Sequence, residues 1–333
     1  MGSGSFGICL STEARGVLER VGFPGRPLCR RIPFSKSAIS AHAFRALPDT
    51  SPFEAMDLKV IKESYTMSQP SQIHLFDNSD AEMQAAYKKA QASFGYFWRE
   101  IAWERRRIVK GLDAAYVKAP FSDLGVDSRP KAKEIEHMWI DQVDFDGETI
   151  SGHLVNEPDK LRSVKQGDAV QMQLSAISDW MYVLNNRAYG GFTINLMRSR
   201  MKRDERAAHD KAWGLDFGDP QKPEVVPPSA TKGWFNFKKS TKVGEHPMSE
   251  NMAPKLAEEI AKNPAMLSWK DEHGWGLLHE LALAGSYACV KVLLEKGADP
   301  RTVTQNGSTP LSLAQSLNWE DVAELLRAHG ATH

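Results

Sequence analysis

Four side chains in the middle of the chain are of types that could bind a small ligand or support acid–base chemistry: His137, Trp139, Asn156 and Asp179. Asp146-Gly147 places two of them, because this dipeptide is a strong hairpin signal and separates two strand-like segments, 134–145 and 148–157. With Asp146-Gly147 as the turn, His137 faces Asn156 at the far end of one sheet face. Two interpretations are open: the pair satisfies its own hydrogen bonds, or it binds a ligand.

The same pairing predicts which face of the hairpin is buried. Its apolar face consists of Trp139, Val143, Phe145, Ile150 and Leu154. His153 is predicted to lie on the face opposite His137, so these two histidines cannot share a metal ion. Trp139, like Trp180 and Tyr182 further along, can be either a core residue or part of a ligand box.

Metal and nucleophile motifs are missing from the sequence. The three cysteines, Cys9, Cys29 and Cys289, form no C-x-x-C pair, which argues against a disulfide framework and a structural zinc site. His279-Glu280 would need a second histidine one helical turn later to bind zinc, and Leu283 stands there. We therefore expect no catalytic residue, no metal and no cofactor.

Composition narrows the classes of partner. The chain has 333 residues, enough for about two domains, and its 42 basic and 42 acidic side chains give a net charge of zero. A nucleic-acid-binding or anionic-membrane-binding protein usually carries a strong basic excess. No apolar run approaches the ~18 residues of a membrane span. We expect a cytoplasmic protein that binds neither nucleic acid nor membrane.

Residues 77 to 206 have the pattern of an α+β unit. Asn78-Ser79-Asp80 offers N-caps for a helix, Gly95 is expected to interrupt it, and Arg105-Arg106-Arg107 is expected to be its solvated end. Strand patterns follow at 115–121, in the hairpin, at 170–174 and at 179–183, and a final helix follows Gly190-Gly191. The prediction is an antiparallel sheet with flanking helices.

An ordered series of motifs in this unit carries a resemblance to a known family. The motifs are Glu136-His137-Met138-Trp139, Gly152-x-Leu154-x-Asn156-x-Pro158, Gly167-Asp168, Ser178-Asp179-Trp180-Met181-Tyr182 and Gly190-Gly191-Phe192-Thr193. They resemble the bacterial domain of unknown function 2314, which includes YegJ-like proteins, over residues 77 to 200. The family has no assigned activity, so the resemblance implies a domain and a bacterial source.

Two segments near the C-terminus repeat each other at a spacing of 33 residues. Gly274 to Ala282 is answered by Gly307 to Gln315, and Val290 to Ala298 by Ala323 to Ala331. This period resembles the ankyrin repeat, a turn followed by two antiparallel helices. Pro254 to Lys262 is expected to be the outer helix of a preceding half repeat, with Pro254 at its first position. The prediction is a small all-α solenoid, whose units stack to bury their apolar faces.

The resemblance to ankyrin repeats implies a partner-binding surface at the turn tips. The tip residues are Glu272, His273, Trp275, Gln305, Asn306 and Ser308. Trp275 is the candidate anchor, because an exposed aromatic residue often carries binding energy. The alternative is that Trp275 packs sideways onto the preceding repeat. For His279 the resemblance implies a structural hydrogen bond to the neighbouring turn.

These features divide the chain into four parts. Residues 1–56 are expected to be a disordered leader, with a transit peptide as the alternative, and residues 57–206 the α+β domain. Residues 207–250 are expected to be a linker, in which the aromatic segment 233–239 either packs onto a domain or is a docking motif. Residues 251–333 are the ankyrin repeats.

The function favoured by the sequence is non-catalytic. We expect a bacterial interaction protein whose ankyrin array binds a protein partner, with an immunity or accessory role as one context. The alternative is an enzyme or small-ligand-binding domain centred on His137 and Asn156, for which the ankyrin repeats provide targeting.

Overall fold

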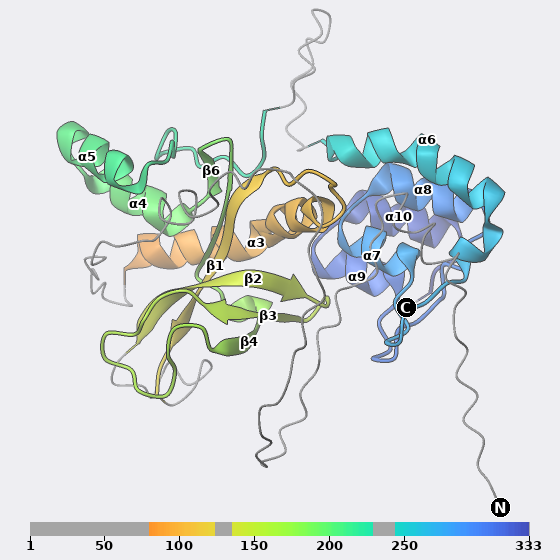
Figure 1. Ribbon diagram of the computed structural model, residues 1–333, viewed down its shortest axis with the longest axis horizontal. Coiled ribbons are helices and arrows are strands. Elements are labelled where there is room, and N and C mark those ends of the chain that lie inside the picture. Colours follow the sequence, from red (N-terminus) through yellow and green to blue (C-terminus); the bar gives the residue numbers. More distant parts are fainter. Residues whose placement is uncertain (1–79, 124–134, 229–243, 333) are drawn as a thin grey trace, which may run out of the picture. The chain divides into compact units, whose positions relative to one another are not determined.

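The computed structural model describes residues 80–123, 135–228 and 244–332 (Figure 1). The predicted leader, Cys9, Cys29 and the aromatic segment 233–239 lie outside these residues. No helix within the described ranges is long and apolar enough to cross a lipid bilayer.

The first part of the described chain is an antiparallel sheet with helices (Figure 1). The helices are α3 (Ala81–Glu104), α4 (Phe192–Arg200) and α5 (Arg203–Trp213), with a short 3-10 helix, η2 (Leu174–Ala176). The strands are β1 (Leu112–Phe121), β2 (Glu136–Phe145), β3 (Thr149–Leu154), β4 (Ala169–Gln173), β5 (Asp179–Leu184) and β6 (Arg187–Gly190). Their order in the sheet is β4-β3-β2-β1-β5-β6. The predicted α+β fold is confirmed. Helix α5 continues past the domain boundary predicted at residue 206.

Helix α3 is a single helix. Asp80 caps it, since its Oδ1 accepts hydrogen bonds from the backbone N–H groups of Glu82 and Met83. The break expected at Gly95 was wrong. A β-carbon at Gly95 would lie 3.1 Å from both the Leu317 carbonyl oxygen and the Trp319 ring. The glycine therefore marks a close approach of another segment to the helix, not a turn in the chain.

The β2–β3 hairpin has a different register from the predicted one. Phe145 pairs with Ile150, because Asp146 accepts hydrogen bonds from the N–H groups of Glu148 and Thr149 and so lengthens the turn. A β-bulge then shifts the register between Asp141 and Asp144, where Gln142 has a φ of 49°.

The bulge divides the predicted apolar face between two cores. Val143 and Phe145 face the larger core as predicted, in a cluster that also contains Ile150 and Leu154. Beyond the bulge the alternation is shifted by one residue, so Met138 and Ile140 take the larger-core side. Trp139 therefore faces the smaller cluster on the other side of the sheet, with Met181, Val183 and Phe217. The prediction that Trp139 shares a face with Phe145 was wrong for this reason.

The second part of the described chain is the all-α array (Figure 1). Its elements are α6 (Pro247–Lys262), the 3-10 helix η3 (Pro264–Leu267), α7 (Leu277–Leu283), α8 (Tyr287–Glu295), α9 (Pro310–Ser316) and α10 (Glu320–Ala328). Pro247, not Pro254, stands at the start of α6, and Pro254 lies inside the helix. The predicted small solenoid is confirmed.

Gly190 offers a direct test of the sheet packing. Its φ is +80°, and a β-carbon there would lie 2.4 Å from the Trp180 carbonyl oxygen. Gly214 is a matched control, since its φ is +66° and nothing lies within 4 Å of its β-carbon position. We expect Gly214→Ala to lower the free energy of unfolding by about 1–2 kcal/mol through backbone conformation alone. Gly190→Ala should lower it by about 1–3 kcal/mol more because of the collision. Denaturant unfolding measures both, and equal losses would contradict the packing described.

Candidate functional site

His137 does not face Asn156. It pairs with Pro120 of β1, its Nδ1 lies 2.9 Å from the Ser178 hydroxyl, and its Nε2 lies 3.5 Å from the Tyr87 hydroxyl. The His137 and Tyr87 rings stack with their centroids 5.5 Å apart. The predicted His137–Asn156 pair was wrong, because the longer turn and the bulge shift β3 along β2.

Asn156 instead extends the backbone pairing of β2. Its Oδ1 accepts a hydrogen bond from the Trp139 N–H at 2.9 Å, and the Trp139 carbonyl accepts one from the Val155 N–H at 2.9 Å. The amide side chain thus replaces a strand carbonyl where β3 has ended. The structure brings Asn156 and Trp139 together through the Trp139 backbone, and the Trp139 ring faces the smaller core.

Asp179 is fully buried and caps helix α4 from strand β5. Its two carboxyl oxygens accept hydrogen bonds from the N–H groups of Trp180, Phe192 and Thr193 and from the Thr193 hydroxyl, at 2.6–2.9 Å. The residue at the N-cap position, Gly191, has no side chain to do this. Burial raises the pKa of the Asp179 carboxyl, and the hydrogen bonds from Thr193 and the charge of Lys118 act in the opposite direction. The geometry is that of a helix cap, and a ligand role for the four predicted residues stays a prediction.

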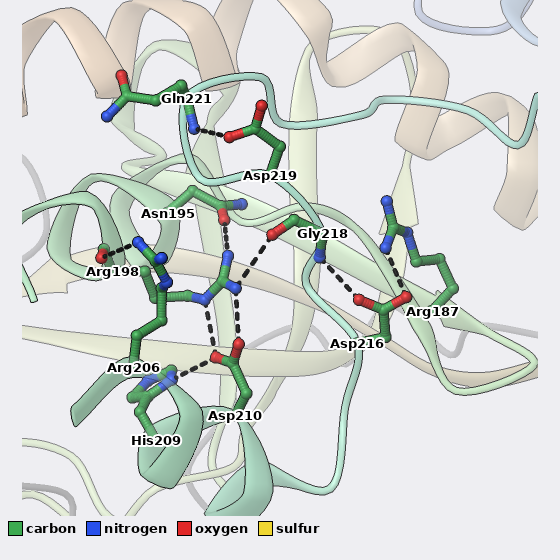
Figure 2. A network of polar contacts seen from close by, with 10 residues as sticks. All are labelled: Arg187, Asn195, Arg198, Arg206, His209, Asp210, Asp216, Gly218, Asp219 and Gln221. Atoms are coloured by element: carbon green, nitrogen blue, oxygen red, sulfur yellow. Dashed lines mark hydrogen bonds and ion pairs between the residues drawn. The ribbon is translucent and has the colours of Figure 1, made fainter. Parts of the chain in front are cut away.

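Arg198 is at the centre of a polar network of the α+β domain (Figure 2). The residue is 2% exposed, and its guanidinium donates to both carboxyl oxygens of Asp210, at 2.7 and 2.8 Å, and to Asn195 Oδ1 and the Gly218 carbonyl. Burial raises the pKa of Asp210, but the bonds from Arg198 and His209 outweigh this and hold it below its ordinary value. This network ties the segment after α5 to α4. Four of the five N–H donors of the Arg198 guanidinium are bonded to protein groups, which argues against an anion-binding role.

The predicted partner-binding residues lie on two consecutive turn tips. Glu272, Gln305 and Asn306 are exposed, while His273 and Ser308 are half-buried. The tips are joined to each other, because the Gln305 N–H donates to the His273 carbonyl at 2.9 Å and Gln305 Nε2 donates to the Glu272 carbonyl at 2.5 Å. The two tips therefore form one continuous edge.

Trp275 is not an exposed anchor. The residue is 4% exposed, its ring lies edge-on to His279 with centroids 5.9 Å apart, and its backbone N–H donates to Asp271 Oδ1 at 2.8 Å. Trp275 is therefore a buried residue with these contacts in its own repeat, and the alternative that it packs sideways onto the preceding repeat stays a prediction. The apolar residue exposed near the tips is Val303, at 49%, which stands one period after Lys270. The sequence could have indicated Val303 through the alignment of the two repeats, because Val303 stands where the preceding repeat has the exposed Lys270.

His279 joins its own turn to the next one. Its Nδ1 accepts a hydrogen bond from the Gly276 N–H at 3.1 Å, so its Nε2 must carry the proton that binds the Thr302 carbonyl at 3.2 Å. The ring is therefore neutral. Burial lowers the pKa of His279 to about 4. Ser312, one period later, plays the same capping role, with its hydroxyl accepting from the Thr309 N–H at 2.9 Å.

Helix α3 packs against the array, which the sequence did not predict. Trp319 lies between the two: its ring is edge-on to Tyr96 at 5.6 Å, the Arg99 guanidinium lies 5.3 Å from its centroid, and its Nε1 donates to the Leu283 carbonyl. At the N-terminus of α6, His246 Nε2 lies 3.1 Å from Glu100 Oε2, and the imidazole stacks on Trp103.

The arginines after α3 are ion-pair partners, not a solvated helix end. Arg106 Nη2 lies 2.7 Å from Glu280 Oε2 of α7, with the two side chains 7% and 16% exposed. Arg105 pairs with Asp144, and Arg107 with Glu100 and Glu104. The charge run was visible in the sequence, but its acidic partners are dispersed along the chain and gave no pattern.

Equivalent positions of the two repeats face the α+β domain. Glu280 of α7 and Leu313 of α9 stand one period apart in the first helix after each tip. Glu280 binds Arg106, and the Leu313 side chain reaches the β-carbon position of Gly147 in the β2–β3 turn. Part of the inner-helix face of the array is thus occupied within the chain, and the edge formed by the tips remains exposed.

Comparisons with known proteins agree with both halves of this description. A family model described as an uncharacterized protein conserved in bacteria (DUF2314) matches residues 80–217, and a model of three ankyrin repeats matches residues 248–333. A putative ankyrin repeat protein of Neisseria meningitidis serogroup B is 41% identical over 256 residues, which is 77% of this chain and 97% of that protein. The two resemblances inferred from the motifs are confirmed.

Two further matches each cover one part of the chain. The uncharacterized protein YegJ of Escherichia coli is 30% identical over 96 residues, 29% of this chain and 58% of YegJ. The crystal structure of the human ASB11 ankyrin repeat domain matches 26% of this chain and 41% of that chain at 30% identity, with a TM-score of 0.22.

The neutral state of His279 predicts a pH dependence of stability. Its pKa is lower in the folded than in the unfolded protein, so the unfolded state binds more protons between the ordinary value of 6.5 and about 4. The free energy of unfolding should therefore fall as the pH decreases through this window, by at most about 1.4 kcal/mol per pH unit from this residue. His279→Ser copies Ser312 and cannot titrate, so the stability of this variant should fall less over the window. Parallel pH profiles for variant and wild type would contradict the assignment.

The Arg106–Glu280 contact can be tested with a double-mutant cycle. Glu280→Leu copies Leu313 but leaves Arg106 buried without this carboxylate, and should cost about 3 kcal/mol of unfolding free energy. Arg106→Met alone should cost a similar amount, because it leaves the carboxylate unpaired. The double variant should recover most of the loss, since an apolar pair fits the position. Strictly additive losses would show that the two side chains do not interact.

Proposed function

Because the chain belongs to the family of bacterial ankyrin repeat proteins that carry a DUF2314 domain, we propose that it binds a protein partner through the edge formed by its turn tips. Ankyrin repeats imply a role in protein interaction. The observation that supports the edge is the division of the array's surface: Arg106, just after α3, and the β2–β3 turn contact the inner helices, whereas Glu272, Gln305 and Asn306 are exposed.

The proposed binding edge is a modified form of the predicted one. It keeps Glu272, His273, Gln305, Asn306 and Ser308 and omits the buried Trp275. Val303 replaces Trp275 as the proposed apolar contact. The exposed Lys270 donates a hydrogen bond from its Nζ to the Val303 carbonyl at 3.3 Å. An apolar side chain surrounded by polar side chains is the usual anatomy of an interface core and its rim.

The proposal also covers the class of partner, the cellular context and the domain boundaries. We propose a protein partner in the cytoplasm rather than nucleic acid or membrane, because basic and acidic residues are equal in number. An immunity or accessory role is the cellular context that we propose for this binding. The alternative, a ligand site centred on His137 and Asn156, stays a prediction; the two side chains bind different groups, the Ser178 hydroxyl and the Trp139 N–H. We propose residues 57–206 and 251–333 as the domains, with the first extended to the end of α5.

The binding edge is tested by affinity purification of tagged full-length protein from its own host. We expect the triple variant Glu272→Ala/Val303→Ser/Asn306→Ala to lose a protein that the wild type retains, with a loss of at least tenfold in the amount recovered. These side chains are exposed, so circular dichroism and the melting temperature should change little.

The matched control lies on α8, the second helix of its repeat, and not on the turn tips or the inner helices. Lys291 and Glu295 of α8 are exposed and pair only with each other at 3.8 Å among the ion pairs described. Lys291→Ala/Glu295→Ala should retain the partner. Loss of the partner in this control but not in the triple variant would refute the proposed edge.

A further inference from the structure

Strand β4 is one edge of the sheet (Figure 1). At the other edge, β6 is covered, because the N–H groups of Ala188 and Gly190 donate to the carbonyls of Asp216 and Glu224 at 2.9 and 2.7 Å. Within the described part of the chain, β4 pairs with β3 alone. Among the described residues, one edge of the sheet is therefore hydrogen-bonded to a further segment, and the other edge is not.

The hydrogen bonds of β3 fix which backbone groups of β4 face outward. The Leu154 N–H donates to the Asp168 carbonyl at 3.0 Å, and the Leu154 carbonyl accepts from the Gly167 N–H at 2.8 Å, so the backbone groups of Leu154 face the strand that contains β4. Hydrogen-bonded pairs alternate along an antiparallel ladder, so Val170 and Met172 bind β3. The N–H and C=O groups of Ala169, Gln171 and Gln173 therefore point away from the sheet. These three residues are the exposed ones of β4.

The residues of β4 itself lack the features that usually protect an edge strand. Native proteins prevent edge pairing with charged side chains, proline or a bulge. The strand Ala169-Val170-Gln171-Met172-Gln173 has neither a charge nor a proline, and its register with β3 is unbroken. An edge with these properties can accept another strand.

We propose that β4 pairs antiparallel with β4 of a second copy of this chain, with Gln171 facing its own twofold mate. In this register Ala169 faces Gln173 on both sides of the axis, and the outward groups form about six hydrogen bonds. A twofold axis brings identical side chains together, so a charged strand would repel its copy. Every facing pair of β4 is neutral, and this makes a second copy the occupant that the strand fits.

The dimer has a functional consequence that depends on the proposed function. Its two ankyrin arrays would bind a partner with two epitopes, or a dimeric partner, more tightly than one array could. The pairing itself does not depend on that function, and its test measures association alone.

Charge substitutions at the axis test the dimer. In sedimentation equilibrium over a concentration series, wild-type full-length protein should pass from the mass of one chain to that of two. Gln171→Lys and Gln171→Glu each place like charges opposite one another, so each should raise the dissociation constant of the dimer about fivefold. An equimolar mixture of the two variants should associate at least as tightly as the wild type, because opposite charges then face each other.

Gln221→Lys is the matched control. Gln221 is also an exposed glutamine, and it lies on the segment after α5 (Figure 2), so its substitution should leave the dimer unchanged. Circular dichroism checks that all variants are folded. Wild-type protein with the mass of one chain at every concentration would overturn the proposal. So would a dimer that Gln171→Lys does not weaken, or that Gln221→Lys weakens equally.

Discussion

Burial of helix α3 on two sides is the constraint on which the rest of the described chain depends. Phe94 and Phe97 of this helix join the core beneath the sheet, where they contact Phe145 and Trp180. The neighbouring face, with Gly95 and Tyr96, meets Trp319 of the array. Carboxylates and guanidinium groups buried on or just after this helix need partners, and Glu100 and Arg106 are paired accordingly with His246 and Glu280.

Much of the fold could be predicted from the sequence, because its signals are local. The period of 33 residues and the alternation along β4 depend on neighbours in the sequence, and they indicated the array and a strand of the sheet. The register of β2 could not be predicted in this way. It depends on a bulge at Gln142 whose cost is offset by packing on both sides of the sheet, and a shift of one residue sends Trp139 to the other core.

The predicted site was less successful than the fold, for a related reason. His137, Asn156 and Asp179 were correctly recognised as unusual polar residues, but each is used locally: by Ser178, by the Trp139 backbone and by the start of α4. A sequence shows the type of a polar side chain, whereas its partner is a property of the folded chain. Gly95 shows the same limit. In a sequence, a glycine that allows another segment of the same chain to approach a helix cannot be told from a glycine that ends the helix.

The different residues at the two equivalent inner positions, Glu280 and Leu313, fix the phase of the repeats. If the array slid along α3 by one repeat, Arg106 would meet a leucine and would be buried beside no carboxylate, at a cost of several kcal/mol. The two repeats have similar backbones, but only one alignment of the array with α3 places a carboxylate beside Arg106. In evolution, repeats can be added after α10 without disturbing the Arg106–Glu280 contact. A repeat inserted before α7 would move Glu280 away from Arg106.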